Sequence, residues 1–137
     1  MTKKQRGMTL IELVVVVAVV AILASLAIPA YGQYVRRAKR TDATAALLRI
    51  AAAQERFYMQ NNTYSGDPAA LGVAGTPDGL YALVIAGAGT AGYTATATAQ
   101  GSQAADEDCR VFSINQLGQR SSSDGDGADT SATCWRR

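Results

Sequence analysis

The sequence predicts an α+β protein in which one long N-terminal helix, transmembrane in its first half, packs on a small antiparallel sheet of three to four strands. Three observations predict this class. An apolar run lies near the N-terminus, a one-sided helical pattern follows it, and short β-rich segments alternate with Gly-rich turns in the second half. About 100 residues remain beyond the apolar run, enough for one domain with a small core.

The apolar run is long enough to cross a membrane. Residues 13–35 carry no charge and span about 34 Å as a helix, against a hydrocarbon core of about 30 Å. A cleaved signal peptide is the alternative, but its best processing site, Ile28-Pro29-Ala30, contains a poor Ile and a Pro. Basic residues lie on both sides of the run, at positions 3–6 and at positions 36–40, so charge counting leaves the topology open.

One carboxylate, Glu12, stands at the start of this run. A carboxylate at the centre of a membrane helix costs roughly 2.5 to 3.5 kcal/mol, and less near an end where the side chain reaches the interface. Glu12 therefore either has a partner or a role, or it is an interfacial residue that marks the start of the helix.

The helical pattern continues to about Asn61. At 100° per residue, one set of residues gathers in a sector of about 120°, with Arg49 and Arg56 opposite. The members of this sector are Leu47, Ile50, Ala51, Gln54, Phe57 and Tyr58. This face is expected to pack on the sheet. Asn61-Asn62 ends the helix, and repeated Gly and Pro mark a long loop over residues 66–79.

Three strand-like runs follow the loop, and a turn over residues 115–118 leads to a possible short fourth strand. The predicted strands are Leu80 to Ile85, Tyr93 to Ala99, Cys109 to Ile114 and Gln119 to Ser122.

Charge and cysteine content exclude some classes. Lys3, Lys4 and Arg6 precede the apolar run, and without them 10 basic residues face 11 acidic ones, a net charge of −1. The protein is therefore no polybasic nucleic-acid binder. Its two cysteines, Cys109 and Cys134, are expected to form one disulfide if this part of the chain is exported.

The stretch from Lys3 to Tyr34 resembles the N-terminus of type IV pilins and their pseudopilin relatives. It has a short basic leader that ends in Gly7, the run Thr9-Leu10-Ile11-Glu12, and Pro29 before an aromatic residue. The resemblance divides the chain into a cleaved leader (1–7), a hydrophobic transmembrane and assembly helix (8–35), and a periplasmic or extracellular globular domain (36–137).

The resemblance also implies roles for single residues. A prepilin peptidase would cut after Gly7 and N-methylate the new terminus at Met8. Glu12 would meet the N-terminal amine of a neighbouring subunit in the fibre, where an unpaired charge is costly. The segment before Pro29 would be a site of local unwinding. The family usually has Phe where Met8 stands, and many members have Gly where Ala21 stands.

The runs "ERFYMQNNTYSGD" and "CRVFSINQLGQR" with the terminal "TCW" are most similar to PilE-type pilins, which are usually minor, priming subunits. The resemblance implies that Cys109 and Cys134 bracket a C-terminal loop. It also implies a single-pass inner-membrane protein that enters an extracellular pilus. Its partners would be other pilin subunits, the peptidase, the assembly machinery and, before assembly, lipid. Roles in adhesion, twitching motility or DNA uptake would follow.

Several motifs suggest binding sites, and simpler interpretations are favoured for each. Gly87, Gly89 and Gly92 fit a dinucleotide fingerprint, but a strand rather than a helix is predicted to follow, which favours a hairpin turn. The Gly-rich run with Asp124, Asp126 and Asp129 is similar to a calcium loop but lacks the closing Glu. Asn61-Asn62-Thr63 fits a glycosylation acceptor, a weak pattern.

No catalytic arrangement or cofactor is predicted, because the chain has no His and no Gly-x-Ser-x-Gly motif. The two cysteines alone do not make a metal site. Besides a fibre subunit, two functions remain: a pseudopilin of a type II secretion or competence machine, and a DNA-binding tip pilin. For the last, Trp135, Arg136 and Arg137 with Arg120 offer stacking and charge, although their footprint is small.

Overall fold

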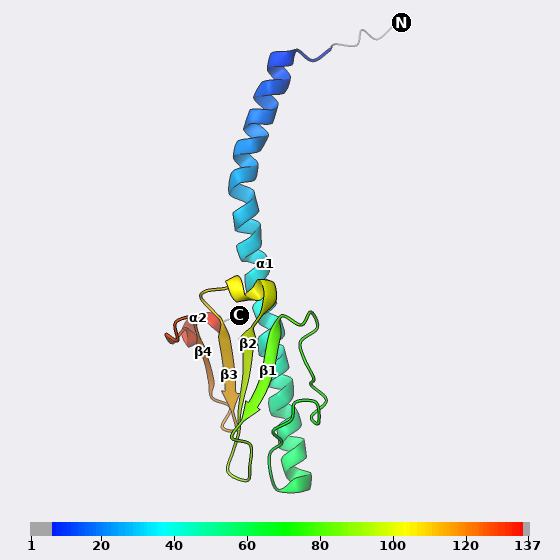
Figure 1. Cartoon of the computed structure of the whole chain (residues 1–137), viewed down its shortest axis with the longest axis vertical. Coiled ribbons are helices and arrows are strands. Elements are labelled where there is room, and N and C mark those ends of the chain that lie inside the picture. The colour runs from blue at the N-terminus through cyan, green and yellow to red at the C-terminus, as the bar shows by residue number, and fades with distance from the viewer. Residues whose placement is uncertain (1–6, 136–137) are drawn as a thin grey trace, which may run out of the picture. The chain divides into compact units, whose positions relative to one another are not determined.

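The computed structural model describes residues 7–135 (Figure 1). The chain forms two compact units that divide between Val35 and Arg36, here called the N-terminal unit (residues 7–35) and the head (residues 36–135). Helix α1, Leu10–Asn61, contributes to both. The α+β class predicted from the sequence is confirmed, with one long helix and a four-stranded antiparallel sheet.

The N-terminal unit is helical from Leu10 onward, continues through Pro29, and exposes its apolar side chains. Leu10 is 81% exposed and Ile28 is 71% exposed. By length and composition this part of α1 can cross a membrane. An apolar surface of this extent is unfavourable in water, so the unit requires a bilayer or other apolar helices around it.

In the head, α1 buries the expected face with a small shift. Arg49 and Arg56 are exposed, while Phe57 and Tyr58 are only half-buried. The fully buried helix residues are Ala43, Ala46, Leu47, Ile50, Ala53 and Gln54. The helix ends where predicted, because Asn62 takes the left-handed conformation (φ 55°) and donates its N–H to the Tyr58 carbonyl, a C-terminal cap.

The sheet is a simple antiparallel meander in the order β1-β2-β3-β4, and Figure 1 shows its strands beside the second half of α1. Its strands are β1 Tyr81–Ala86, β2 Thr94–Ala99, β3 Val111–Asn115 and β4 Arg120–Ser123. All four lie within one or two residues of the predicted runs. The glycines of the dinucleotide-like motif lie in the β1–β2 hairpin loop, and strand β2 follows them, so the helix that a dinucleotide site needs is absent there.

The core lies between α1 and the inner face of the sheet. The alternating "TATATA" of β2 points its alanines inward, and Ala95 and Ala97 are fully buried. Small residues on both sides let the helix lie close to the sheet. Tyr81 and Phe112 are the largest fully buried side chains of the core, with ring centroids 6.0 Å apart and the rings edge to face.

Two short helices were not predicted from the sequence. The 3₁₀ helix η1, Gly101–Ala105, lies between β2 and β3, and α2, Ser131–Cys134, follows β4. A disulfide joins Cys109 to Cys134, and both cysteines are buried. This confirms the predicted disulfide and places a bridged loop at the C-terminal end of the fold.

Candidate assembly helix and basic groove

Thr9 and Glu12 form the start of α1. The Glu12 N–H donates to Thr9 Oγ1 at 3.3 Å, one half of a capping box in which Thr9 is the N-cap. The Glu12 carboxylate is exposed and has no hydrogen-bond or ion-pair partner among residues 7–135. Gly7 and Met8 precede the helix and are exposed as well. The basic residues of the leader lie outside the described residues.

A polar collar holds α1 at the start of the head; we use this name for Arg36, Arg40, Gln103 and Asp106. Arg40 makes a two-pronged ion pair with Asp106, with N–O distances of 2.7 and 2.6 Å. Gln103 Nε2 donates to the Arg36 carbonyl at 3.0 Å and to Asp106 at 3.2 Å. Gln103 lies in the middle of η1 and Asp106 is its C-terminal cap, so this short helix positions the side chains that contact α1.

The central ion pair of the collar is largely buried, which strengthens the attraction between its two charges. The side chains of Arg40 and Asp106 are 12% and 4% exposed, so the pair is shielded from solvent. The hydrogen bonds that Arg40 donates to the Asp106 carboxylate raise the pKa of Arg40, which stays cationic. Beside the collar, Lys39 pairs with Asp78 at the surface, and this contact raises the pKa of Lys39.

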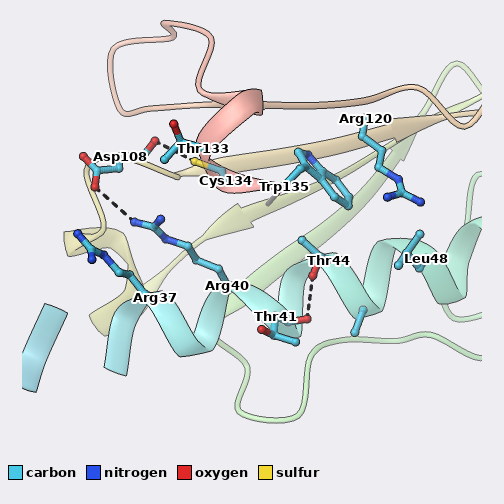
Figure 2. A pocket seen from close by; sticks show the side chains of 11 residues that line it. Arg37, Arg40, Thr41, Thr44, Leu48, Asp108, Arg120, Thr133, Cys134 and Trp135 are labelled. Carbon is cyan, nitrogen blue, oxygen red and sulfur yellow. Dashed lines mark hydrogen bonds and ion pairs between the residues drawn. The ribbon is translucent and has the colours of Figure 1, made fainter. Parts of the chain in front are cut away.

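A groove of about 650 Å³ runs between α1 and the C-terminal segment of the head (Figure 2). One wall is the α1 face that carries Arg37, Thr41, Thr44 and Leu48. The opposite wall is built from Asp108 and Arg120 with Thr133, Cys134 and Trp135. Cys134 belongs to the disulfide, so the bridge fixes this second wall.

Trp135 is the central apolar side chain of the groove and is held from three directions. Its indole N–H donates to the Ser121 carbonyl at 2.8 Å. Its ring meets Phe112 edge to face, and the Arg120 guanidinium lies 5.4 Å from the ring centroid, a cation–π contact. Figure 2 shows Trp135 projecting from the upper wall toward α1.

Comparison with protein families identifies the chain. A model described as "Type IV minor pilin ComP, DNA uptake sequence receptor" matches residues 29–113, more than half of the sequence. The chain belongs to this type IV minor pilin family. A second model, the prokaryotic N-terminal methylation motif, matches residues 2–28. The family is one of pilus subunits rather than of enzymes.

Solved structures are similar to this minor pilin. The minor pilin PilV of Neisseria meningitidis shares 19% identity, with a TM-score of 0.55 over 69% of this chain and 93% of that one, which shows the same fold. A type IV pilin from Shewanella oneidensis shares 26% identity, with a TM-score of 0.49 over 62% of this chain and 89% of that one. No curated protein sequence matched the chain.

The acidic loop of the minor pilin uses its carboxylates internally. Asp124 accepts from the N–H groups of Asp126 and Ala128 at 2.9 and 2.8 Å. Asp129 accepts from the backbone and hydroxyl of Ser131, and these bonds lower the pKa of Asp129. Among residues 7–135 no group of three His, Cys, Asp or Glu side chains is placed to hold a metal ion.

The structure brings together groove residues that lie far apart in the sequence. Trp135 and Arg120 do lie together, as the DNA-binding hypothesis requires. Arg37, some hundred residues earlier in the chain, joins them across the groove and was not foreseen. Its only signal in the sequence is the basic run at positions 36–40, a pattern that also bears on membrane topology.

Proposed function

We propose that this minor pilin is made as a precursor with residues 1–7 as leader, is cut after Gly7, and is N-methylated at Met8. Residues 8–35 then hold it in the inner membrane, with residues 36–137 exported. The disulfide supports export, because such bonds persist in oxidising compartments. From the membrane the subunit enters a type IV pilus fibre by packing its apolar helix among those of neighbouring subunits.

The Glu12 carboxylate carries this proposal. It is the one ionisable group in residues 8–35 apart from tyrosines, it lies in an exposed apolar helix, and it has no partner among the described residues. Once the leader is removed, Met8 gains an amine four residues away in sequence. In a bundle of apolar helices, an ammonium from one subunit and a carboxylate from the next stabilise each other, because either charge alone is costly there.

The helix start provides a competing explanation for Glu12, although only the backbone half of the capping box is formed. A Glu or Gln at this position supports the start of a helix whether or not it meets another subunit. Glu12→Gln separates the two explanations, because it keeps a capping side chain and removes the charge.

The test compares fibres sheared from the native host. We expect Glu12→Val and Glu12→Gln to be cut and to accumulate in the inner membrane, yet to be absent or strongly depleted from fibres. Glu12→Asp, with the charge on a shorter arm, should keep part of the activity. Gly7→Glu is the processing control and should leave an uncut precursor by mass spectrometry. If Glu12→Gln is found in fibres at the same level as the native protein, the charge of Glu12 is not needed for assembly and its role is limited to the start of the helix.

A second candidate function is reception of DNA during uptake, alongside the adhesion and twitching motility that pili support. The description of the matched family favours it over a secretion pseudopilin, and so does the groove with its two exposed guanidiniums and Trp135. Deletion of the minor pilin should then lower transformation by added DNA while fibres are still assembled. Unchanged transformation in a deletion strain would contradict this function.

A further inference from the structure

We propose that Arg36 and Arg37 bind the phosphates of anionic phospholipids in the outer leaflet of the inner membrane, with the Thr41 hydroxyl as a further donor. We call these three residues the arginine edge of the head. This inference rests on the proposed membrane stage of the subunit, and it assigns that stage a class of lipid.

Chain connectivity places the arginine edge at the membrane surface. The uncharged segment ends at Val35, and Arg36 and Arg37 follow it directly within α1. Two residues span at most about 7 Å, whatever the angle between the N-terminal unit and the head. The headgroup layer on each side of the hydrocarbon core is about 5–8 Å thick. Both long side chains therefore reach lipid phosphates when residues 8–35 span the bilayer.

Two tyrosines mark the same end of the membrane segment. Tyr31 and Tyr34 are exposed and lie within four residues of Val35. Tyrosine is enriched at the level of lipid headgroups, because its ring is apolar and its hydroxyl can be hydrated there. A tyrosine pair followed by two arginines is therefore the pattern of a segment whose end stays among the headgroups.

Ion pairing in the head leaves the two arginines available. The next two cations of α1 are each held by two carboxylates: Lys39 by Asp42 and Asp78, and Arg40 by Asp106 and Asp108. The side chains of Arg36 and Arg37 make no ion pair or hydrogen bond within residues 7–135. Because these four carboxylates balance the four cations of residues 36–40, long-range attraction is weak here and binding depends on direct contact.

The donors of the arginine edge suit a phosphate. A guanidinium donates two parallel N–H groups to phosphate oxygens. Thr41 follows Arg37 by one helical turn on the same face, and its exposed hydroxyl has no partner in the described part of the chain. η1 bonds to the Arg36 carbonyl through Gln103, and its five residues carry no charge that would repel phosphates.

The arginine edge favours an anionic lipid over a zwitterionic one. In phosphatidylcholine a quaternary ammonium lies close to the phosphate and opposes the approach of a guanidinium. Phosphatidylglycerol has no such cation, so its phosphate can accept both N–H groups of an arginine. The predicted ligand is therefore a phospholipid with net negative charge.

Native mass spectrometry of the full chain in a neutral detergent counts bound lipids directly. The protein is titrated with phosphatidylglycerol, with phosphatidylcholine of the same acyl chains, and with glycerol phosphate, which lacks the chains. We expect phosphatidylglycerol to bind about 25-fold more tightly than phosphatidylcholine, since each arginine near an anionic headgroup contributes about fivefold. Equal affinity for the two lipids would overturn the proposal. Binding of glycerol phosphate as tight as that of phosphatidylglycerol would show a site for free phosphate instead.

Matched charge variants test the two arginines. Arg36→Gln with Arg37→Gln should bind both lipids equally. Arg49→Gln with Arg56→Gln removes the same charge from exposed positions of α1 that lie twelve or more residues further along, and it should keep the preference. Equal losses in the two pairs would show attraction by net charge and refute the site. A circular dichroism melt checks that each variant is folded.

Cell fractionation separates failure of this site from failure of the proposed function. If the native chain lies in the inner-membrane fraction but shows no preference for phosphatidylglycerol, the arginine edge is rejected and the membrane stage stands. If the chain is absent from that fraction, the proposed function is itself contradicted, and this inference falls with it.

Discussion

Tyr81 illustrates how a single residue limits the stability of the head. Its side chain is 2% exposed, and its hydroxyl has no hydrogen-bond partner within the part of the chain that the structure describes. A buried polar group without a partner costs roughly 1–3 kcal/mol. We therefore expect Tyr81→Phe, which keeps the ring against Phe112, to raise the melting temperature by about 4–8 °C, equivalent to about 1 kcal/mol.

The same substitution should also change how the free energy of unfolding depends on pH. Burial raises the pKa of Tyr81 to about 12, above the value of 10.0 in an unfolded chain. The Gln103 side chain nearby opposes this rise, although its geometry does not make a hydrogen bond to the hydroxyl. Folding thus disfavours the phenolate, so the head keeps its full stability below pH 10 and loses stability as the pH rises toward 12. Unfolding by urea at pH 9 and pH 11 should show a smaller alkaline loss for Tyr81→Phe than for the native protein. A lower melting temperature for Tyr81→Phe would mean that the hydroxyl does have a partner.

The success of prediction from sequence at this scale depends on distance along the chain. Thr9 and Glu12 are three residues apart and belong to the run that resembles type IV pilins, although their pairing at the start of α1 was not predicted. Arg37 and Trp135 share a groove only because the sheet returns the chain to α1, and no local pattern encodes that return. The two cysteines were predictable despite their separation, since a chain with two cysteines allows a single intramolecular pairing.

At the scale of elements, the collar shows how a short helix fixes a long one. η1 delivers Gln103 and the following Asp106 to the first turn of α1 in the head. Asp106→Asn keeps the side-chain size but leaves the Arg40 cation without its main partner in a buried site. Breaking a buried pair is costly, and we expect a loss of about 3 kcal/mol in the free energy of unfolding.

Asp78→Asn is the matched control for the collar. It breaks the ion pair with Lys39, where the Asp78 side chain is 50% exposed, so solvent already screens both charges. Its expected cost is below about 1 kcal/mol. Chemical unfolding followed by circular dichroism measures both variants under the same conditions. Similar losses for the two substitutions would indicate that the collar is no stronger than a surface ion pair.

Long elements were predictable and short ones were not, for a physical reason. α1 and the strands bury a periodic face, and that period is visible in the sequence as one-sided or alternating apolar residues. η1 and α2 span five and four residues, too few to show a period. Each depends on tertiary contacts instead: Gln103 in η1 bonds to α1, and Cys134 in α2 bonds covalently to Cys109.

For the whole molecule, the disulfide links stability to the shape of the groove between α1 and the C-terminal segment. It closes a segment with a sequence separation of 25 residues that includes β3, β4 and α2, and Trp135 follows directly. The chain-entropy model gives about 3.5 kcal/mol for a loop of this size, a large share of the stability of a domain of about 100 residues. Since the inner face of β2 carries alanines, the core offers little surplus to offset such a loss.

We therefore expect Cys109→Ala with Cys134→Ala to lower the melting temperature of the head by about 14 °C or more, at roughly 4–8 °C per kcal/mol. Without the bridge the second groove wall loosens, so Trp135 should also lose its fixed environment, and its emission should shift to longer wavelength below the melting transition. Reduction of the native protein with dithiothreitol should reproduce both effects, which separates loss of the bond from loss of the side chains. If melting falls by only a few degrees while Trp135 emission is unchanged, the contacts of Trp135 with Phe112 and Ser121 hold the groove without help from the disulfide.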